Sequence, residues 1–102
     1  MDALADKLTR LLADLGDSPD AVAAFLEGQG VTGCRMQATH CPVAEYLKRA
    51  TGHRRVAVDM ASVITLGERG DLGAHALTPV PVSDFIERFD RGLFPALIAT
   101  GG

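Results

Sequence analysis

The chain has 102 residues, of which 47% are hydrophobic and 23% charged, and its formal net charge at pH 7 is −3. This composition is that of one globular domain, large enough to bury a core without metals or disulfides, and it excludes a disordered chain. The apolar residues are grouped periodically rather than in a run of about 18 or more, which excludes a membrane span. Because the chain opens directly into an acidic periodic segment rather than a signal peptide, we expect a cytoplasmic protein with two reduced thiols.

The first predicted element is a helix over residues 3–15. Leucines recur there with a helical period, at Leu4, Leu8, Leu11, Leu12 and Leu15. A helix that faces the core is the simplest interpretation, and the alternative is a dimer seam. We therefore expect two parts. Residues 1–17 are an amphipathic helix that is either added to the domain or used for dimerisation, and residues 18–102 are the α+β core domain.

A second helix is predicted to begin after Ser18, which suits the N-cap, with Pro19 at the first helical position. Gly28 or Gly30 ends it. A helix, a glycine turn and a further helix would together make a helix-turn-helix. Gly33 would then lie inside the second of these helices and weaken it by about 1 kcal/mol.

The most completely specified element is a helix over residues 42–51. Pro42 fits the first helical position, where its missing N–H has no intrahelical partner, and this makes Cys41 the N-cap. Gly52 can adopt the left-handed conformation that ends a helix. Glu45 and Arg49 are predicted to pair at i,i+4.

Short β-branched runs follow this helix. Arg54–Asp59 and Ser62–Leu66 are predicted to pair as antiparallel strands, with Met60-Ala61 between them. Since a two-residue turn prefers Asn or Gly, we expect a bulge or a longer turn at this junction. Residues 67–73 are glycine-rich and predict a flexible loop, and residues 74–77 predict a third strand.

A final helix is predicted to begin near Pro81 and to end at Gly92, with an apolar face built by Val82, Phe85, Ile86 and Phe89. The apolar tail over residues 93–98 is expected to fold back over the core, or else to form an exposed interface. Together these elements predict an α+β fold. It has three to four helices packed on a two- to three-stranded antiparallel sheet.

Two segments carry a resemblance to known proteins. Residues 41–47 read CPVAEYL, and residues 89–97 read FDRGLFPAL. They resemble the CPxAxYL and FDxGxxPxL boxes of a group of small uncharacterised proteins from actinobacteria and their phages. The resemblance covers residues 18–97 and implies a shared fold, with no known activity and no catalytic residues.

Cys41 is the residue whose chemistry extends beyond packing. A thiol at a helix N-terminus, with His40 and Arg35 nearby, is predicted to have a lowered pKa. With Cys34 as a resolving partner, this favours a redox sensor as one alternative function. In the simpler interpretation Cys41 caps the helix and fills a small space.

A metal site is the next alternative. Cys34, His40, Cys41 and His53 are ligand types that zinc binds, and they fall within twenty residues of one another. Their spacing is not that of a zinc motif, because the two cysteines are too far apart in the sequence for a zinc knuckle. We therefore expect no metal and no other cofactor.

One segment is basic within an acidic protein, since residues 31–60 have a net charge of +3. Its possible contact patch consists of Lys48, Arg49, Arg54 and Arg55. A solvated helix end is the simpler interpretation. The alternatives are an acidic protein partner or, less favoured, a weak nucleic-acid contact.

No nucleophile elbow, phosphate loop or pair of catalytic carboxylates is recognisable, and an enzyme is not expected. The sequence favours a regulatory or interaction module that acts through protein–protein contacts, commonly by forming a homo-oligomer. The candidate interface residues are Leu4, Leu8, Leu11, Leu15, Phe94, Leu97 and Ile98.

Overall fold

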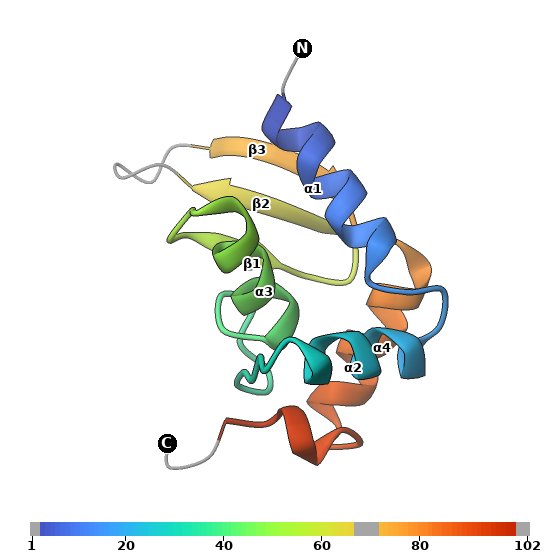
Figure 1. The fold of residues 1–102 in the computed structure, drawn as a ribbon. Coiled ribbons are helices and arrows are strands. Elements are labelled where there is room, and N and C mark those ends of the chain that lie inside the picture. Colours follow the sequence, from blue (N-terminus) through green and yellow to red (C-terminus); the bar gives the residue numbers. More distant parts are fainter. Residues whose placement is uncertain (1–2, 67–71, 100–102) are drawn as a thin grey trace.

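The structure is a computed structural model that describes residues 3–66 and 72–99. Helices cover one face of a three-stranded sheet (Figure 1). The elements in chain order are α1 (Ala3–Asp14), α2 (Pro19–Gly28), α3 (Pro42–Thr51), β1 (Val56–Val58), β2 (Ser62–Leu66), β3 (Leu72–Leu77), α4 (Val80–Asp90) and the 3₁₀ turn η1 (Pro95–Leu97). The predicted α+β fold is confirmed. Of the loop expected over residues 67–73, residues 67–71 lie outside the described residues, and the last two belong to β3.

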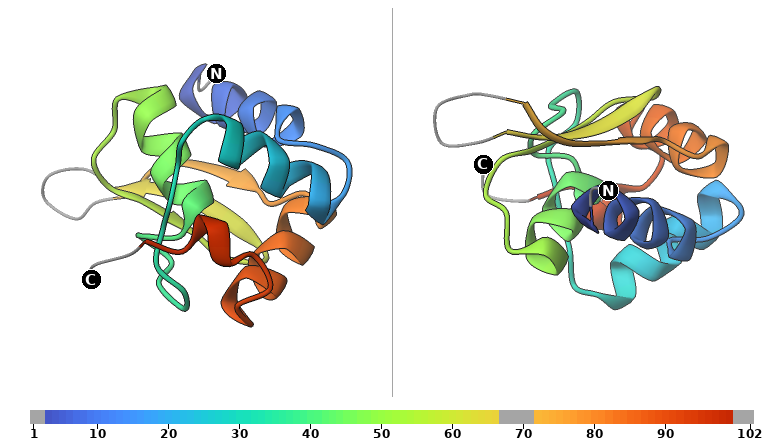
Figure 2. Two further views of the ribbon diagram at one scale, coloured as in Figure 1. Left: turned by 60° about the horizontal axis from the view of Figure 1, so that its bottom comes forward. Right: turned by 90° about the horizontal axis from the view of Figure 1, so that it is seen from above.

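The sheet is antiparallel in the order β1-β2-β3, as predicted. Val58, Val63 and Ala76 lie opposite one another and are buried, because alternate side chains of a strand point to the same face. Figure 2 shows α1, α2 and α3 on one side of the sheet, which is the side of these buried residues.

The β1–β2 junction spans residues 59–61, one residue more than the Met60-Ala61 pair, which agrees with the longer turn that we expected. Asp59 makes this possible, because its Oδ1 accepts the N–H groups of Ala61 and Ser62, both at 2.7 Å. The N–H of Asp59 donates in turn to the carbonyl of Ser62 at 3.0 Å. The aspartate side chain thus closes the junction without the positive φ that an Asn-Gly turn would use.

A single core joins all the helices to the sheet. Leu8 and Leu12 of α1 and Leu15, just after its end, are fully buried in it, and α1 packs against β3. In the tail, Phe94 stacks on Phe85 of α4 with ring centroids 5.2 Å apart. The expectation that the tail folds back over the core is therefore confirmed.

The segment between α2 and α3 contains no helix, so the helix-turn-helix interpretation is wrong. Gly33 instead forms a parallel bridge with Ile98 of the tail. The N–H of Gly33 donates to the carbonyl of Leu97 and the N–H of Ala99 to the carbonyl of Gly33, both at 2.8 Å. Within the described ranges, each helix is too short or too polar to span a membrane.

Candidate functional site

The start of α3 has the geometry that the sequence predicts. Cys41 is the N-cap, and its Sγ accepts the N–H of Ala44 at 3.4 Å. Pro42 occupies the first helical position, and Gly52 ends the helix with φ +76°. A sulfur cap, a proline with no N–H to satisfy and a glycine free of Cβ strain together fix where α3 begins and ends.

The predicted lowering of the Cys41 pKa is wrong. Burial raises the pKa of this thiol to about 11, and the negative charge of Asp90 acts in the same direction. Hydrogen bonds from the N–H groups of Ala44 and Val43 favour the thiolate, but they do not offset the loss of solvent. Burial thus favours the neutral, capping form of the Cys41 thiol, and the lowered pKa that the redox-sensor alternative assumed is absent.

Cys34 lies in the loop that passes over the start of α3. Both cysteines are free thiols, with Cys34 half-buried and Cys41 buried. The N–H of Cys34 donates to the carbonyl of His40 at 2.7 Å, which holds the loop against the helix start. Gly33 permits this approach, since a Cβ at that position would lie 2.4 Å from the backbone nitrogen of Pro42.

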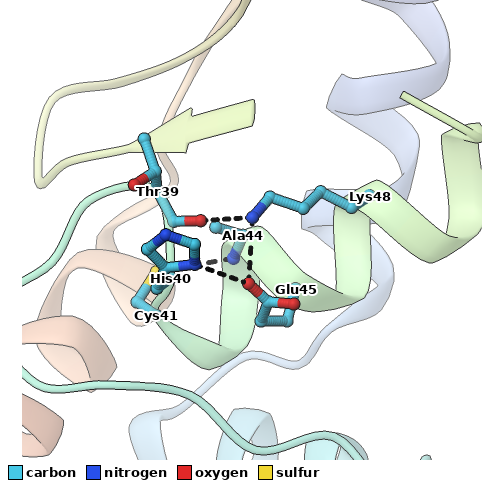
Figure 3. A network of polar contacts seen from close by, with 6 residues as sticks. All are labelled: Thr39, His40, Cys41, Ala44, Glu45 and Lys48. Carbon is cyan, nitrogen blue, oxygen red and sulfur yellow. Dashed lines mark hydrogen bonds and ion pairs between the residues drawn. The ribbon is translucent and has the colours of Figure 1, made fainter. Parts of the chain in front are cut away.

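A polar network covers the same helix start (Figure 3). Lys48 Nζ donates to Glu45 Oε1 at 2.9 Å and to the carbonyl of Thr39, and His40 Nδ1 lies 3.3 Å from Glu45 Oε1. The expected i,i+4 pair of Glu45 with Arg49 does not form, since the carboxylate turns to Lys48 at i,i+3 instead. Lys48 of the predicted basic patch is thus held by hydrogen bonds to Glu45 and Thr39.

The remaining members of the predicted basic patch are exposed on and after the end of α3. They are Arg49, Arg54 and Arg55, with His53 also exposed between them. Within residues 3–66 and 72–99, no three His, Cys, Asp or Glu side chains lie close enough to hold a metal ion. Cys34, His40, Cys41 and His53 accordingly do not converge on a common point.

The predicted interface residues lie mostly in or against the core. Leu8, Leu15 and Leu97 are buried in the hydrophobic cluster. Leu4, Leu11, Phe94 and Ile98 are half-buried and pack against that cluster. A partner could therefore reach only the edges of these two apolar segments without unfolding the domain.

The most distinctive surface feature is a groove of about 240 Å³ above the start of α3. We call it the methionine groove, and its lining residues are Met36, Gln37, Ala38, Cys41, Val58, Asp59, Met60, Ile86 and Asp90. Cys41, Val58 and Ile86 are 3%, 2% and 6% exposed and form its floor. Met36 and Met60, at 78% and 57% exposed, form its rim.

The backbone at Met36 is strained. Among the described residues, Met36 is the one non-glycine residue with positive φ, at +61°. Its N–H donates to Asp90 Oδ1 at 2.9 Å, across 54 positions of sequence, and nearby the N–H of Val58 donates to the carbonyl of Ala38 at 2.9 Å. Side chains with a Cβ disfavour this conformation, so the tertiary contacts hold an exposed methionine in place against a local cost.

A second hollow of about 270 Å³ lies between the end of α2 and α3. Its lining residues are Gln29, Val31, Tyr46, Arg49 and Ala50. None of these five has the exposed apolar side chain or the positive φ of Met36. The methionine groove is therefore the better candidate site.

No known protein family, curated protein or solved structure matches the chain. Only the geometry of this chain therefore identifies the candidate site. Sequence reasoning missed Met36, Met60, Asp59 and Asp90. Asp90 lies in the second of the two resemblance boxes, and Cys41 in the first, so these boxes meet at one groove.

Proposed function

We propose that the protein is a non-enzymatic interaction module that binds a segment of a partner protein in the methionine groove. The observation that supports this proposal is the pair of exposed methionines on the rim, one of them on strained backbone. Large apolar side chains gain nothing from exposure to water, and methionine adapts its shape to varied partners. A strained residue at an apolar groove is typical of a binding surface rather than of a structural turn.

The size of the groove favours a protein partner over a cofactor. Its volume is about 240 Å³. Pockets for drug-sized ligands span roughly 300–1,000 Å³, so this groove suits one or two side chains. A segment that inserts such side chains and covers the rim is the occupant that fits these dimensions.

We further propose that these contacts regulate a process in the cytoplasm, where free thiols such as Cys34 and Cys41 persist. The two boxes that carry the resemblance to small actinobacterial and phage proteins each supply a lining residue, Cys41 and Asp90. On that basis the groove is the feature those proteins would share with this chain.

Site-specific photo-crosslinking in the producing cell tests the proposal. A photoreactive amino acid replaces Met36 or Met60, and a matched control replaces Leu93, which is exposed but does not line the groove. We expect discrete adducts from positions 36 and 60 and none from position 93. Equal labelling at all three positions would contradict the proposal, and an adduct of twice the chain mass would identify a second copy as the partner.

A further inference from the structure

The methionine groove carries charge of one sign. Two of its lining residues, Asp59 and Asp90, are carboxylates, and no described basic side chain lines it. Arg35, which precedes Met36 in the sequence, directs its guanidinium at Gly92 instead. An apolar floor between two negative charges is therefore what an incoming partner meets.

Both carboxylates are held in place by backbone groups. Asp90 Oδ1 accepts the N–H of Met36, and Asp59 Oδ1 accepts the N–H groups of Ala61 and Ser62. Neither residue takes part in the ion pairs of the described chain, which join Glu45 to His40 and Lys48, and Glu87 to Arg91. Both carboxylates are thus fixed in position, and neither has an ion-pair partner among the described residues.

An occupant that covers the rim removes water from these carboxylates. Asp59 is exposed and Asp90 half-buried, so both are hydrated in the free protein. A purely apolar occupant would leave the two charges desolvated without compensation, whereas a cation placed beside them restores a favourable interaction. Charge complementarity therefore selects among the segments that could fill the groove.

As an extension that rests on the proposed function, we infer that the partner segment places an apolar side chain between Met36 and Met60 and a lysine or arginine against Asp59 and Asp90. The methionines supply adaptable apolar contact, and the carboxylates supply selectivity. The occupant is thus a basic amphipathic segment of a protein. A neutral segment of similar shape binds more weakly, and an acidic one more weakly still.

Three short peptides test this inference. Each has the same length and a central leucine pair, which is flanked by lysines in the first, by serines in the second and by glutamates in the third. They are titrated into the full-length chain labelled at its methionine methyl groups, and binding is read from the Met36 and Met60 signals. We expect the lysine peptide to bind about fivefold to tenfold more tightly than the serine peptide, and the glutamate peptide more weakly than both.

Isosteric variants separate charge from structure. The double variant Asp59→Asn/Asp90→Asn keeps the side-chain carbonyl that accepts the backbone N–H groups and removes both charges. We expect it to bring the affinity ratio of the lysine and serine peptides close to one. The control Asp6→Asn/Glu27→Gln removes the same charge at exposed positions outside the groove and should leave the ratio unchanged.

Four results would overturn the inference. Equal affinity of the lysine and serine peptides, or a ratio that survives in Asp59→Asn/Asp90→Asn, overturns the inference. A fall of the ratio in the control variant overturns it too, because net charge would then be the cause. If no peptide moves either methyl signal while crosslinks still form at positions 36 and 60, the inference fails and the proposed function stands.

Discussion

Cys41 and Met36 line the same groove, yet the first is buried and the second is among the most exposed apolar residues of the described chain. The floor around Cys41 has the features of a core: satisfied caps, apolar neighbours and no strain. The rim at Met36 has exposed apolar surface and positive φ instead. Residues that line one cavity therefore have different roles, because the floor maintains the fold and the rim is open to a partner.

The largest expected loss of stability comes from a substitution at Gly33, which packs against the backbone of Cys41 and Pro42. Gly33→Ala should lower the free energy of unfolding by about 3 kcal/mol or more, because the new Cβ would overlap backbone atoms of Cys41 and Pro42. The matched control is Gly28→Ala, where a Cβ meets nothing within 4 Å and a helix former replaces glycine. Urea unfolding measures both, and a stable Gly33→Ala variant would refute the close packing of loop and helix.

A pair of alanine substitutions compares floor and rim directly. Ile86→Ala should cost about 2–4 kcal/mol of stability, since it leaves a cavity under the groove. Met36→Ala should change stability by less than about 0.5 kcal/mol, because that side chain is already in water. Similar losses in the two variants would show that the rim is part of the core.

The buried thiol of Cys41 in the floor should also change how the free energy of unfolding depends on pH. The pKa of Cys41 is raised from 9.0 to about 11 by burial, so the folded state keeps its proton longer than the unfolded state does. The resulting stability is fully present below pH 9 and is lost as the pH rises towards 11. In that window the free energy of unfolding should fall by up to about 1.4 kcal/mol for each pH unit. Cys41→Ala should lack this component, and an identical pH profile for the two proteins would contradict the buried thiol.

Removing the backbone strain at Met36 should have a small effect of the opposite sign. Met36→Gly should raise stability by about 0.5–1 kcal/mol, because glycine accepts φ +61° without strain. The same substitution should weaken binding of the lysine peptide, since half of the rim is removed. Met60→Gly is the control, because its backbone has no positive φ and no strain is relieved there. A loss of stability in Met36→Gly would show that the methionine side chain itself supports the fold.

The floor was largely predictable from the sequence, and the rim was not. The order Cys41-Pro42 with a later Gly52 identifies a capped helix locally, and the apolar period places Ile86 on a buried face. Met36 lies in a loop without a period, and its position depends on Asp90, which is 54 residues away. A contact of that span leaves no pattern in either segment.

The pKa of Cys41 and the role of the α1 leucines both depend on how deeply these side chains are buried, which a single sequence does not reveal. The pattern at Cys41 indicates a helix dipole, but only the packed structure shows that desolvation outweighs it. The leucine stripe of α1 favours a core helix, although it also fits a dimer seam. Its three inward leucines lie in the same cluster as Phe85 and Phe89, which identifies the core role in this chain.

The bridge between Gly33 and Ile98 bears on the order of folding during synthesis. Two hydrogen bonds of 2.8 Å and the buried side chain of Leu97 join the loop before α3 to a segment translated 65 positions later. The strands and the four α-helices are therefore all translated before the strand-like partner of Gly33 has been made. The core and the methionine groove are thus completed together, because Leu97 enters the core in the same segment that anchors the loop at Gly33.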